Sequence, residues 1–183
     1  MNVLALSGSL RRASHSRGLL RAAQEAAPAG ASVELYDGWA EVPAFNQDLE
    51  NAPPPLVREL RDRIAAADAL MIATPEYNGS IPGALKNALD WASRPHGESV
   101  LMSKPVAVVS SSPSPFGGTW AGEHLRRALA LSGAVVVERE LAIGKVDQLF
   151  ADGELADPET RHNLSELRDE LVETAGAELA LAA

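Results

Sequence analysis

Residues 2–17 have the sequence NVLALSGSLRRASHSR, in which a short apolar run gives way to a polar, glycine-containing loop. An apolar run of this length that ends in serine and glycine is typical of a buried strand entering a loop. Apolar residues at helical spacing follow, which predicts a helix over residues 16–27 that ends at Pro28 and Gly30. The chain therefore begins with a strand, a loop and a helix.

This alternation recurs along the chain. Further strands are expected at four apolar stretches, residues 32–36, 69–73, 105–110 and 134–137. Helices are expected where apolar residues recur at helical spacing, in residues 56–64, 82–92, 125–129 and 164–172. Two segments are expected to be irregular, residues 37–55 and 141–157, and the alanine-rich tail beyond Gly176 is expected to fray.

Five strands that alternate with helices predict an α/β fold, a parallel sheet with helices on both faces. Since the sequence contains no repeat and no linker, we expect a single domain over residues 1–183. Parallel sheets bind ligands beyond the carboxyl ends of their strands, where the strand order reverses. The loops after the first, third and fourth strands are therefore the expected site.

Composition excludes several classes of function. The 183 residues include no cysteine, which rules out disulfides, thiolate metal sites and cysteine nucleophiles and suits a reducing cytoplasm. A net charge of −9 argues against nucleic-acid binding, and no apolar stretch is long enough to span a membrane. His96, His124 and His162 lack the spacing of zinc ligands, and no G-x-S-x-G motif is present, so neither a metal site nor a hydrolase is expected.

The first loop (residues 8–17) has the features of an anion site. It leads into a helix N-terminus, where unpaired N–H groups and the helix dipole favour negative charge. Serine hydroxyls and the guanidinium of Arg11 or Arg12 suit phosphate oxygens. The loop matches neither a dinucleotide fingerprint nor a Walker loop. An ordinary capped helix with a solvated, arginine-rich face is the alternative.

The second loop (residues 74–87) has the sequence TPEYNGSIPGALKN. Its two prolines and two glycines favour one rigid shape, which can present main-chain groups to a flat heteroaromatic edge. Tyr77 is placed to lie near such a ring, and Asn78 can both donate and accept hydrogen bonds. A plain turn, with Tyr77 as a lid over the core, is the alternative.

These two loops resemble a known family. Gly8-Ser9-Leu10-Arg11, followed by Ser14 and Arg17, resembles the phosphate loop of the NADPH-dependent FMN reductases. Residues 74–91, TPEYNGSIPGALKNALDW, resemble the second hallmark of the same family, and the resemblance weakens beyond about residue 135. It implies a flavodoxin-like three-layer α/β/α sandwich with a five-stranded parallel sheet in the strand order 2-1-3-4-5.

The resemblance also implies a set of FMN-binding residues. Those expected around the phosphate are Ser9, Arg11, Ser14 and Ser16. Those expected along the isoalloxazine ring are Pro75, Glu76, Tyr77, Asn78 and Gly79. His15 is a further candidate for the phosphate, although a solvated or packed imidazole fits it equally well. Glu76 is expected either to tune the flavin potential by its charge or to brace its loop.

The third loop (residues 111–119, SSPSPFGGT) resembles the family's glycine-containing loop after the fourth strand. Ser111, Gly117 and Gly118 are candidate flavin contacts, because glycines allow the backbone to approach a ring closely. A plain turn into the next helix is the alternative. Trp91 is expected to pack at the end of its helix, whereas Trp39 and Phe45 are candidates for a substrate pocket or a subunit contact.

The implied activity is transfer of electrons from NADPH or NADH through FMN to a small-molecule acceptor, by a ping-pong mechanism. The acceptors of the resembling family are free flavin, quinone, chromate and azo compounds, and no catalytic side chain is expected because the cofactors perform the hydride transfer. The resemblance further implies a homodimer or homotetramer. Two other hypotheses stay open, a flavodoxin-type electron carrier without a substrate of its own and a scaffold that has lost its flavin.

Overall fold

The computed structural model describes residues 1–27 and 30–182, so Pro28, expected to end the first helix, lies outside the described residues. The strands of the main sheet are β1 (Asn2–Ser7), β2 (Ser32–Leu35), β3 (Ala69–Pro75), β4 (Pro105–Ser111), β5 (Val135–Val136) and β6 (Leu141–Ile143). The α-helices are α1 (His15–Glu25), α2 (Pro55–Ala66), α3 (Gly83–Ala92), α4 (Thr119–Leu131) and α5 (Pro158–Ala182). Short 3-10 helices η1 (Gly38–Glu41), η2 (Gln47–Leu49) and η3 (Val146–Gln148) and a hairpin of β7 (Phe150–Ala151) and β8 (Glu154–Leu155) complete the described elements.

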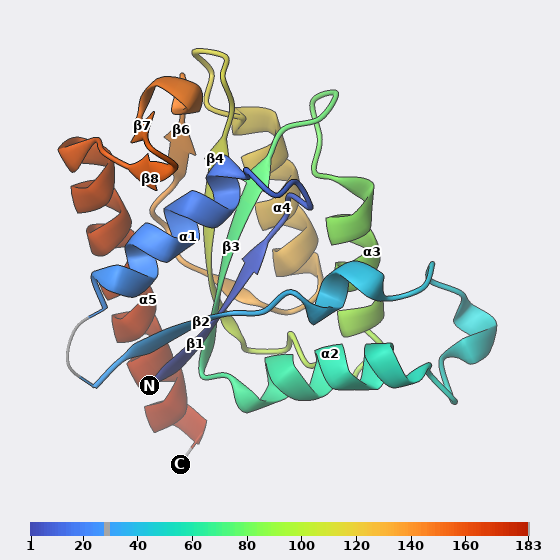
Figure 1. Ribbon diagram of the computed structural model, residues 1–183. Helices are drawn as coiled ribbons and strands as arrows, with labels where there is room; N and C mark the ends of the chain where they lie inside the picture. The colour runs from blue at the N-terminus through green and yellow to red at the C-terminus, as the bar shows by residue number, and fades with distance from the viewer. Residues whose placement is uncertain (28–29, 183) are drawn as a thin grey trace.

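The strands of the main sheet are parallel and lie in the order β2-β1-β3-β4-β5, as predicted (Figure 1). The order reverses between β1 and β3, which pair with Val3 opposite Ala69 and Ser7 opposite Ala73. All strands therefore end at the same edge, and the first, second and third loops gather there at the top of Figure 1. Such an edge at a reversal of strand order is where open α/β sheets bind ligands.

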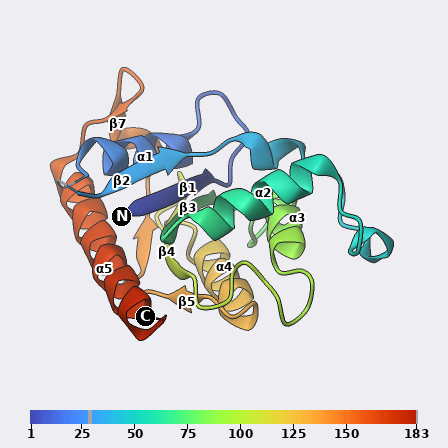
Figure 2. The ribbon, with the colours of Figure 1, turned by 90° about the horizontal axis from the view of Figure 1, so that it is seen from below.

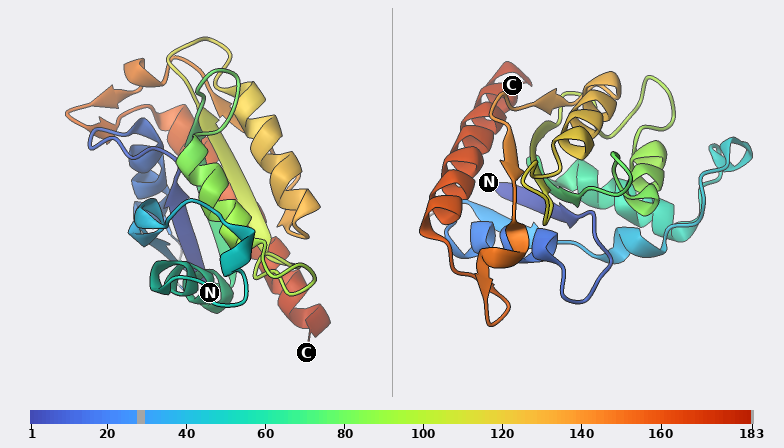
Figure 3. Two further views of the ribbon diagram at one scale, coloured as in Figure 1. Left: turned by 90° about the vertical axis from the view of Figure 1, so that its right-hand side faces the viewer. Right: turned by 90° about the horizontal axis from the view of Figure 1, so that it is seen from above.

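Helices cover both faces of the sheet and give three layers (Figures 2 and 3). Alternate strand residues point to opposite faces, so Leu4 and Leu6 pack with α2, α3 and α4, whereas Val3 and Ala5 pack with α1 and α5. Strands buried on both faces are continuously apolar. This explains why the runs in β1, β3 and β4 carry so few polar residues.

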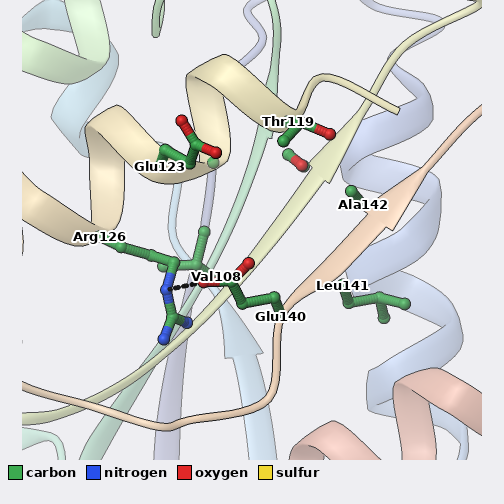
Figure 4. Close-up of a pocket in the computed structure, with 9 residues that line it drawn as sticks. Val108, Thr119, Glu123, Arg126, Glu140, Leu141 and Ala142 are labelled. Atoms are coloured by element: carbon green, nitrogen blue, oxygen red, sulfur yellow. Dashed lines mark ion pairs between the residues drawn. The ribbon is translucent and has the colours of Figure 1, made fainter. Parts of the chain in front are cut away.

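The edge of the sheet beside β4 differs from the prediction of one fifth strand, because two short strands lie there. β5 pairs with the start of β4, and β6 pairs with its end, Leu141 lying opposite Val109. Between the two strands, Arg126 of α4 forms an ion pair with Glu140 at 3.2 Å and donates hydrogen bonds to the carbonyls of Glu138 and Arg139 (Figure 4). The prediction that residues 141–157 are irregular is therefore wrong, because β6, η3 and the β7–β8 hairpin lie within them.

The C-terminal helix also differs from expectation. α5 begins with Asp157 accepting hydrogen bonds from the backbone N–H (2.8 Å) and the hydroxyl (2.6 Å) of Thr160, and these bonds lower the pKa of the Asp157 carboxyl. Its apolar side chains pack against the sheet as far as Ala175. The helix then continues to Ala182, so the prediction that the tail beyond Gly176 frays is wrong.

The long connection before α2 has little regular structure, as predicted, apart from η1 and η2. The part around η2 extends away from the body of the domain (Figures 2 and 3). Among the described residues, no helix combines the length and the apolar character that a membrane crossing requires.

Candidate functional site

The three loops are contiguous at the carboxyl edge of the sheet. The N–H of Gly8 donates to the carbonyl of Ala73 at 2.7 Å, which ties the start of the first loop to the start of the second. Pro75 at the end of β3 lies opposite Ser111 at the end of β4, which brings the second loop beside the third. The two segments with the family's sequence hallmarks thus form adjoining parts of one surface.

The first loop presents hydrogen-bond donors at the start of α1. Ser14 is the N-cap, and its hydroxyl oxygen accepts a hydrogen bond from the N–H of Arg17 at 3.2 Å. The preceding first-turn N–H groups, those of His15 and Ser16, have no intrahelical acceptor because of the helix geometry. Arg11 is exposed and its backbone N–H donates to the hydroxyl of Ser9 at 3.4 Å. The helix N-terminus therefore offers two amides, and the loop that leads into it carries the hydroxyl of Ser9 and the exposed side chain of Arg11.

The side chain of His15 turns toward the protein. Its ring packs on Phe150 of the β7–β8 hairpin, with the ring centroids 5.1 Å apart. Phe150 also lies against Gly18, where an added Cβ would come within 2.4 Å of the phenyl ring. This placement favours the packed imidazole over a phosphate contact from the side chain, and it leaves the backbone N–H of His15 available.

The second loop contains a tight hairpin turn. The backbones of Tyr77 and Ser80 exchange two hydrogen bonds, at 2.9 and 3.1 Å, around Asn78 and Gly79, which have φ values of 53° and 71°. Two successive residues with positive φ define the turn that the dipeptide Asn-Gly prefers. Tyr77 is 48% exposed, so the alternative in which its ring forms a lid over the core is wrong.

Glu76 braces the second loop against α4. Its carboxylate accepts a hydrogen bond from the N–H of Ala121 at 3.2 Å, in the first turn of that helix. The helix N-terminus also favours a negative charge there. Of the two roles expected for Glu76, the structure therefore favours the bracing role for its side chain, and the backbone of the loop is what faces outward.

The third loop is bound mainly to the protein itself. The N–H of Ser112 donates to the carbonyl of Ile143 at 3.1 Å, and the N–H of Lys145 donates to the carbonyl of Ser114 at 3.0 Å. Gly117 is buried with φ 66°, and a Cβ there would lie 2.6 Å from the backbone carbon of Ala142. Ser111 and Gly118 are buried as well. Close approach to β6 thus explains Gly117 without a ligand, which sequence reasoning did not anticipate.

A hollow of about 570 Å³ lies next to the first loop. One wall is the first loop itself, and the other is formed by residues 37–41, including Trp39, which is only 1% exposed. The Arg17 guanidinium forms an ion pair with Asp37 across this hollow, and the hydrogen bond in the pair raises the pKa of Arg17. The sequence marked Trp39 as a pocket candidate but gave no sign that the first loop would be its opposite wall.

Two hallmark residues of α3 bind the segment that directly follows that wall. The Asn87 side chain accepts a hydrogen bond from the N–H of Phe45 at 2.7 Å and donates to the carbonyl of Pro43 at 3.0 Å. The indole N–H of Trp91 donates to the same carbonyl at 2.8 Å, and Phe45 packs edge-on against the Trp91 ring. We call Asn87 and Trp91 the clasp. The expected packing of Trp91 at the end of its helix is confirmed, since it is 1% exposed.

Two other features complete the description of this edge. The hydroxyl of Ser80 and Nδ1 of His124 are hydrogen-bonded at 2.7 Å, which ties the second loop to α4.

In the part of the chain that the structure describes, no three His, Asp or Glu side chains gather closely enough to hold a metal ion. The pocket in Figure 4, between α4 and β6, encloses only about 20 Å³ and lies behind the third loop.

The residues at this edge fit a flavin mononucleotide. A phosphate dianion suits the two first-turn amides, the hydroxyl of Ser9 and the guanidinium of Arg11. A flat ring suits the half-exposed Tyr77 and the open space at Gly79, where an added Cβ would meet no atom within 4 Å. The fold and the site together define a flavodoxin-like, flavin-binding domain.

Residues 1–148 match the sequence profile of the NADPH-dependent FMN reductases. The chain therefore belongs to this family of oxidoreductases, whose cofactors are FMN and a reduced nicotinamide coenzyme.

Individual relatives are similar over most of their length. An NAD(P)H-dependent FMN reductase of Pseudomonas aeruginosa is 41% identical over 164 residues, 88% of each chain. A quinone reductase of Pseudomonas putida is 38% identical over 162 residues, 87% of each chain. Among solved structures, the flavoenzyme NAD(P)H:acceptor oxidoreductase FerB of Paracoccus denitrificans superposes with a TM-score of 0.87 at 34% identity, covering 97% of this chain and 98% of its own.

Proposed function

We propose that this chain binds FMN across its three loops and passes electrons from NADPH or NADH to a quinone or another small acceptor. The observation that carries the proposal is the contact between the first and second loops, Gly8 to Ala73, at the reversal of strand order. With that contact, the proposed anion site would lie beside the exposed turn that two backbone hydrogen bonds close between Tyr77 and Ser80. A ligand with a phosphate at one end and a flat ring at the other would occupy both.

Each loop has a separate part in holding the flavin. Ser9, Arg11 and the first-turn amides of His15 and Ser16 would hold the phosphate, with Ser14 keeping the helix start in shape through its bond to the N–H of Arg17. The backbone from Pro75 to Gly79 would lie along the ring, fixed by the hairpin turn and by the bond from Glu76 to α4.

The third loop has the least direct part. Gly117 and Gly118 are buried, so Ser111 and these glycines would act by supporting the turn of the second loop. An added Cβ at Gly118 would lie 3.4 Å from the Cβ of Glu76, which shows how closely the two loops pack. Direct contacts between these three residues and the flavin are proposed from the family resemblance alone.

When bound, FMN supplies the redox chemistry, accepting a hydride from the nicotinamide and returning electrons to the acceptor. The protein supplies binding and orientation. Backbone amides of the second loop outside the Tyr77–Ser80 hydrogen bonds would stabilise negative charge on a bound ring, in the manner of an oxyanion hole. The exposed ring of Tyr77 borders the space where a planar acceptor would stack.

Among the possible acceptors, a quinone has the most support from the names of similar proteins. The relatives in Pseudomonas putida and in a Burkholderia species are named quinone reductase and 2-hydroxy-1,4-benzoquinone reductase. Free flavin, chromate and azo compounds are the other acceptors to be compared. Since donor and acceptor would use the same space beside the ring, the kinetics would be ping-pong.

We further propose that the protein is a homodimer or homotetramer in the cytoplasm, where reduced nicotinamide coenzymes are produced. Phe116 and Trp120 support assembly, because both are exposed large side chains, and their rings lie 5.6 Å apart at the start of α4. The segment around η2, which extends from the body of the domain, is a second candidate for a subunit contact (Figure 3). Light scattering of the purified protein would give its mass in solution.

The function is tested by a visible absorption spectrum of the purified protein, followed by NADPH and NADH oxidation with 1,4-benzoquinone, FMN, chromate and an azo dye. A flavin spectrum, rapid oxidation with benzoquinone and parallel double-reciprocal plots are expected. A flavin spectrum without oxidation of either coenzyme would favour the electron carrier. Failure to take up FMN would contradict the proposal altogether.

A further inference from the structure

The hollow between the first loop and residues 37–41 is separate from the surface assigned to the flavin ring. Neither the second nor the third loop lines it. It shares only the first loop with the proposed phosphate site, so a ligand in it would lie beside the flavin phosphate. Its volume of about 570 Å³ is in the range of small-molecule sites.

The lining of the hollow carries one more positive than negative side chain, although the chain as a whole is acidic. Three of its lining residues are arginines, Arg11, Arg12 and Arg17. Arg17 is neutralised by Asp37, and Glu41 is the other acidic residue of the lining. Arg11 is assigned to the flavin phosphate, whereas Arg12 is exposed and forms no ion pair with any residue that the structure describes. One guanidinium in the hollow is thus left for a second anion.

The wall formed by residues 37–41 is anchored to the rest of the domain. Trp39 is buried in the core, and the backbone that follows it, from Val42 to Phe45, is bound to α3 by the clasp. The Arg17–Asp37 ion pair fixes the two walls relative to each other. A cavity held in this way loses little conformational freedom when a ligand enters, which favours binding.

From this arrangement we infer that the hollow binds the phosphorylated adenosine half of the nicotinamide coenzyme and that Arg12 contacts the 2′-phosphate that distinguishes NADPH from NADH. The inference rests on the proposed function, because it assumes that the nicotinamide half reaches the ring at the second loop. A guanidinium forms paired hydrogen bonds with phosphate oxygens, which gives both charge and shape recognition. The protein would accordingly prefer NADPH.

The test compares Arg12→Ala with Arg21→Ala in the FMN-loaded protein. Arg21 is exposed on α1 and does not line the hollow, so its variant controls for the loss of one positive charge near the N-terminus. Calorimetry measures the affinity for adenosine 2′,5′-bisphosphate and for 5′-AMP, two probes that undergo no redox reaction. Steady-state kinetics give the KM values for NADPH and NADH with one quinone as acceptor.

Arg12→Ala is expected to weaken bisphosphate binding about 10-fold or more, the size of one charge-assisted contact. The ratio of the KM for NADPH to that for NADH should rise by a similar factor, while FMN content and the Arg21→Ala control stay at the level of the unaltered protein. Equal changes for bisphosphate and AMP, or equal behaviour of the two variants, would overturn the inference. If the unaltered protein bound the bisphosphate but reduced no acceptor, the proposed function would fail while this site remained.

Discussion

Tyr77 extends from the hairpin turn of the second loop with 48% of its surface exposed. Because the turn is held by backbone hydrogen bonds between Tyr77 and Ser80, it does not depend on the aromatic ring. Tyr77→Ala is therefore expected to change the free energy of unfolding by less than about 1 kcal/mol. The value of kcat/KM for a quinone should fall about 2- to 10-fold, since an aromatic contact contributes about 0.5–1.5 kcal/mol.

Urea unfolding and steady-state kinetics on Tyr77→Ala and Tyr77→Phe separate the two effects. The Phe variant keeps the ring and should retain most of the activity. A large loss of stability with normal kinetics would show that the ring packs more tightly than its exposure indicates.

Tyr36 gives the protein a pH-dependent term in its stability. It is buried and donates a hydrogen bond to Glu59 at 3.2 Å, and burial together with the nearby carboxylate raises the pKa of Tyr36 to about 12. In the unfolded chain a tyrosine loses its proton near pH 10. Between about pH 10 and pH 12 the folded state thus holds a proton that the unfolded state has lost, so stability falls as the pH rises.

Tyr36→Phe is expected to remove this decline and to cost about 0.5–1.5 kcal/mol at pH 7, the contribution of one hydrogen bond. Urea unfolding of the unaltered protein and of Tyr36→Phe, at pH 7 and at several values from pH 9 to pH 11, gives the slope of the free energy of unfolding against pH for each. Parallel slopes in this range would contradict the assigned pKa.

At the scale of elements, α3 connects the second loop to the wall of the hollow. The helix begins at Gly83, directly after the hairpin turn and Pro82, so the last residues of the expected second loop are helical; its Asn87 and Trp91 bind the backbone of residues 42–45. The part of the hallmark sequence that follows the loop is therefore explained by this contact. A shift of α3 would therefore move the turn of the second loop and the segment of residues 42–45 together.

Asn87→Ala should destabilise the protein by about 1–3 kcal/mol, because it removes both the acceptor for the partly buried N–H of Phe45 and the donor to the carbonyl of Pro43. Lys86→Ala is the matched control, since Lys86 forms only a half-exposed ion pair with Asp90 on the same helix. Denaturant unfolding gives the change in stability, and limited proteolysis should cut residues 42–52 faster in Asn87→Ala. Equal proteolysis of the two variants would show that the clasp does not hold the wall.

Much of the element order could be predicted from the sequence because local patterns determine it. The apolar runs of β1, β3 and β4 and the turn signals after them placed the three loops correctly. The β5–β6 break could not be predicted in this way, because it depends on Arg126 of α4 binding the backbone of Glu138 and Arg139. α5 packs against the sheet only as far as Ala175, and its continuation to Ala182 agrees with the high helix propensity of alanine, which the prediction of a frayed tail left out.

In the candidate site too, local sequence patterns identify residues, whereas the contacts between elements that explain them do not show in the sequence. The resemblance marked Glu76 and Gly117, but the partners that explain them, Ala121 and Ala142, lie on other elements and are visible only in the fold. Tertiary contacts of this kind leave no pattern in the local sequence.

At the scale of the whole molecule, the C-terminal part of the chain supports the first loop from behind. Residues beyond 148 lie outside the family match, yet Phe150 packs on His15, and the buried Arg168 donates to the carbonyl of Ala26 at the end of α1. Arg161 adds an ion pair with Glu25 on the same helix. Contacts from the residues beyond 148 thus hold α1, the helix at the proposed phosphate site, at both of its ends.

Because the core is formed by the helices and the sheet and not by the loops, the domain should fold without flavin, and FMN should add to its stability through binding alone. At a concentration 100 times the dissociation constant, a ligand stabilises the folded state by about 2.7 kcal/mol. For a domain of this size that corresponds to a rise in Tm of about 5–10 °C. Arg11→Ala should keep the Tm of the flavin-free protein when FMN is absent, because an exposed loop arginine contributes little to the core. At the same FMN concentration its rise in Tm should be about half that of the unaltered protein or less, since loss of one charge-assisted contact weakens binding about 10-fold or more. Arg21→Ala should keep the full rise. Calorimetry with and without FMN measures these shifts, and an undiminished rise in Arg11→Ala would move the phosphate away from the first loop.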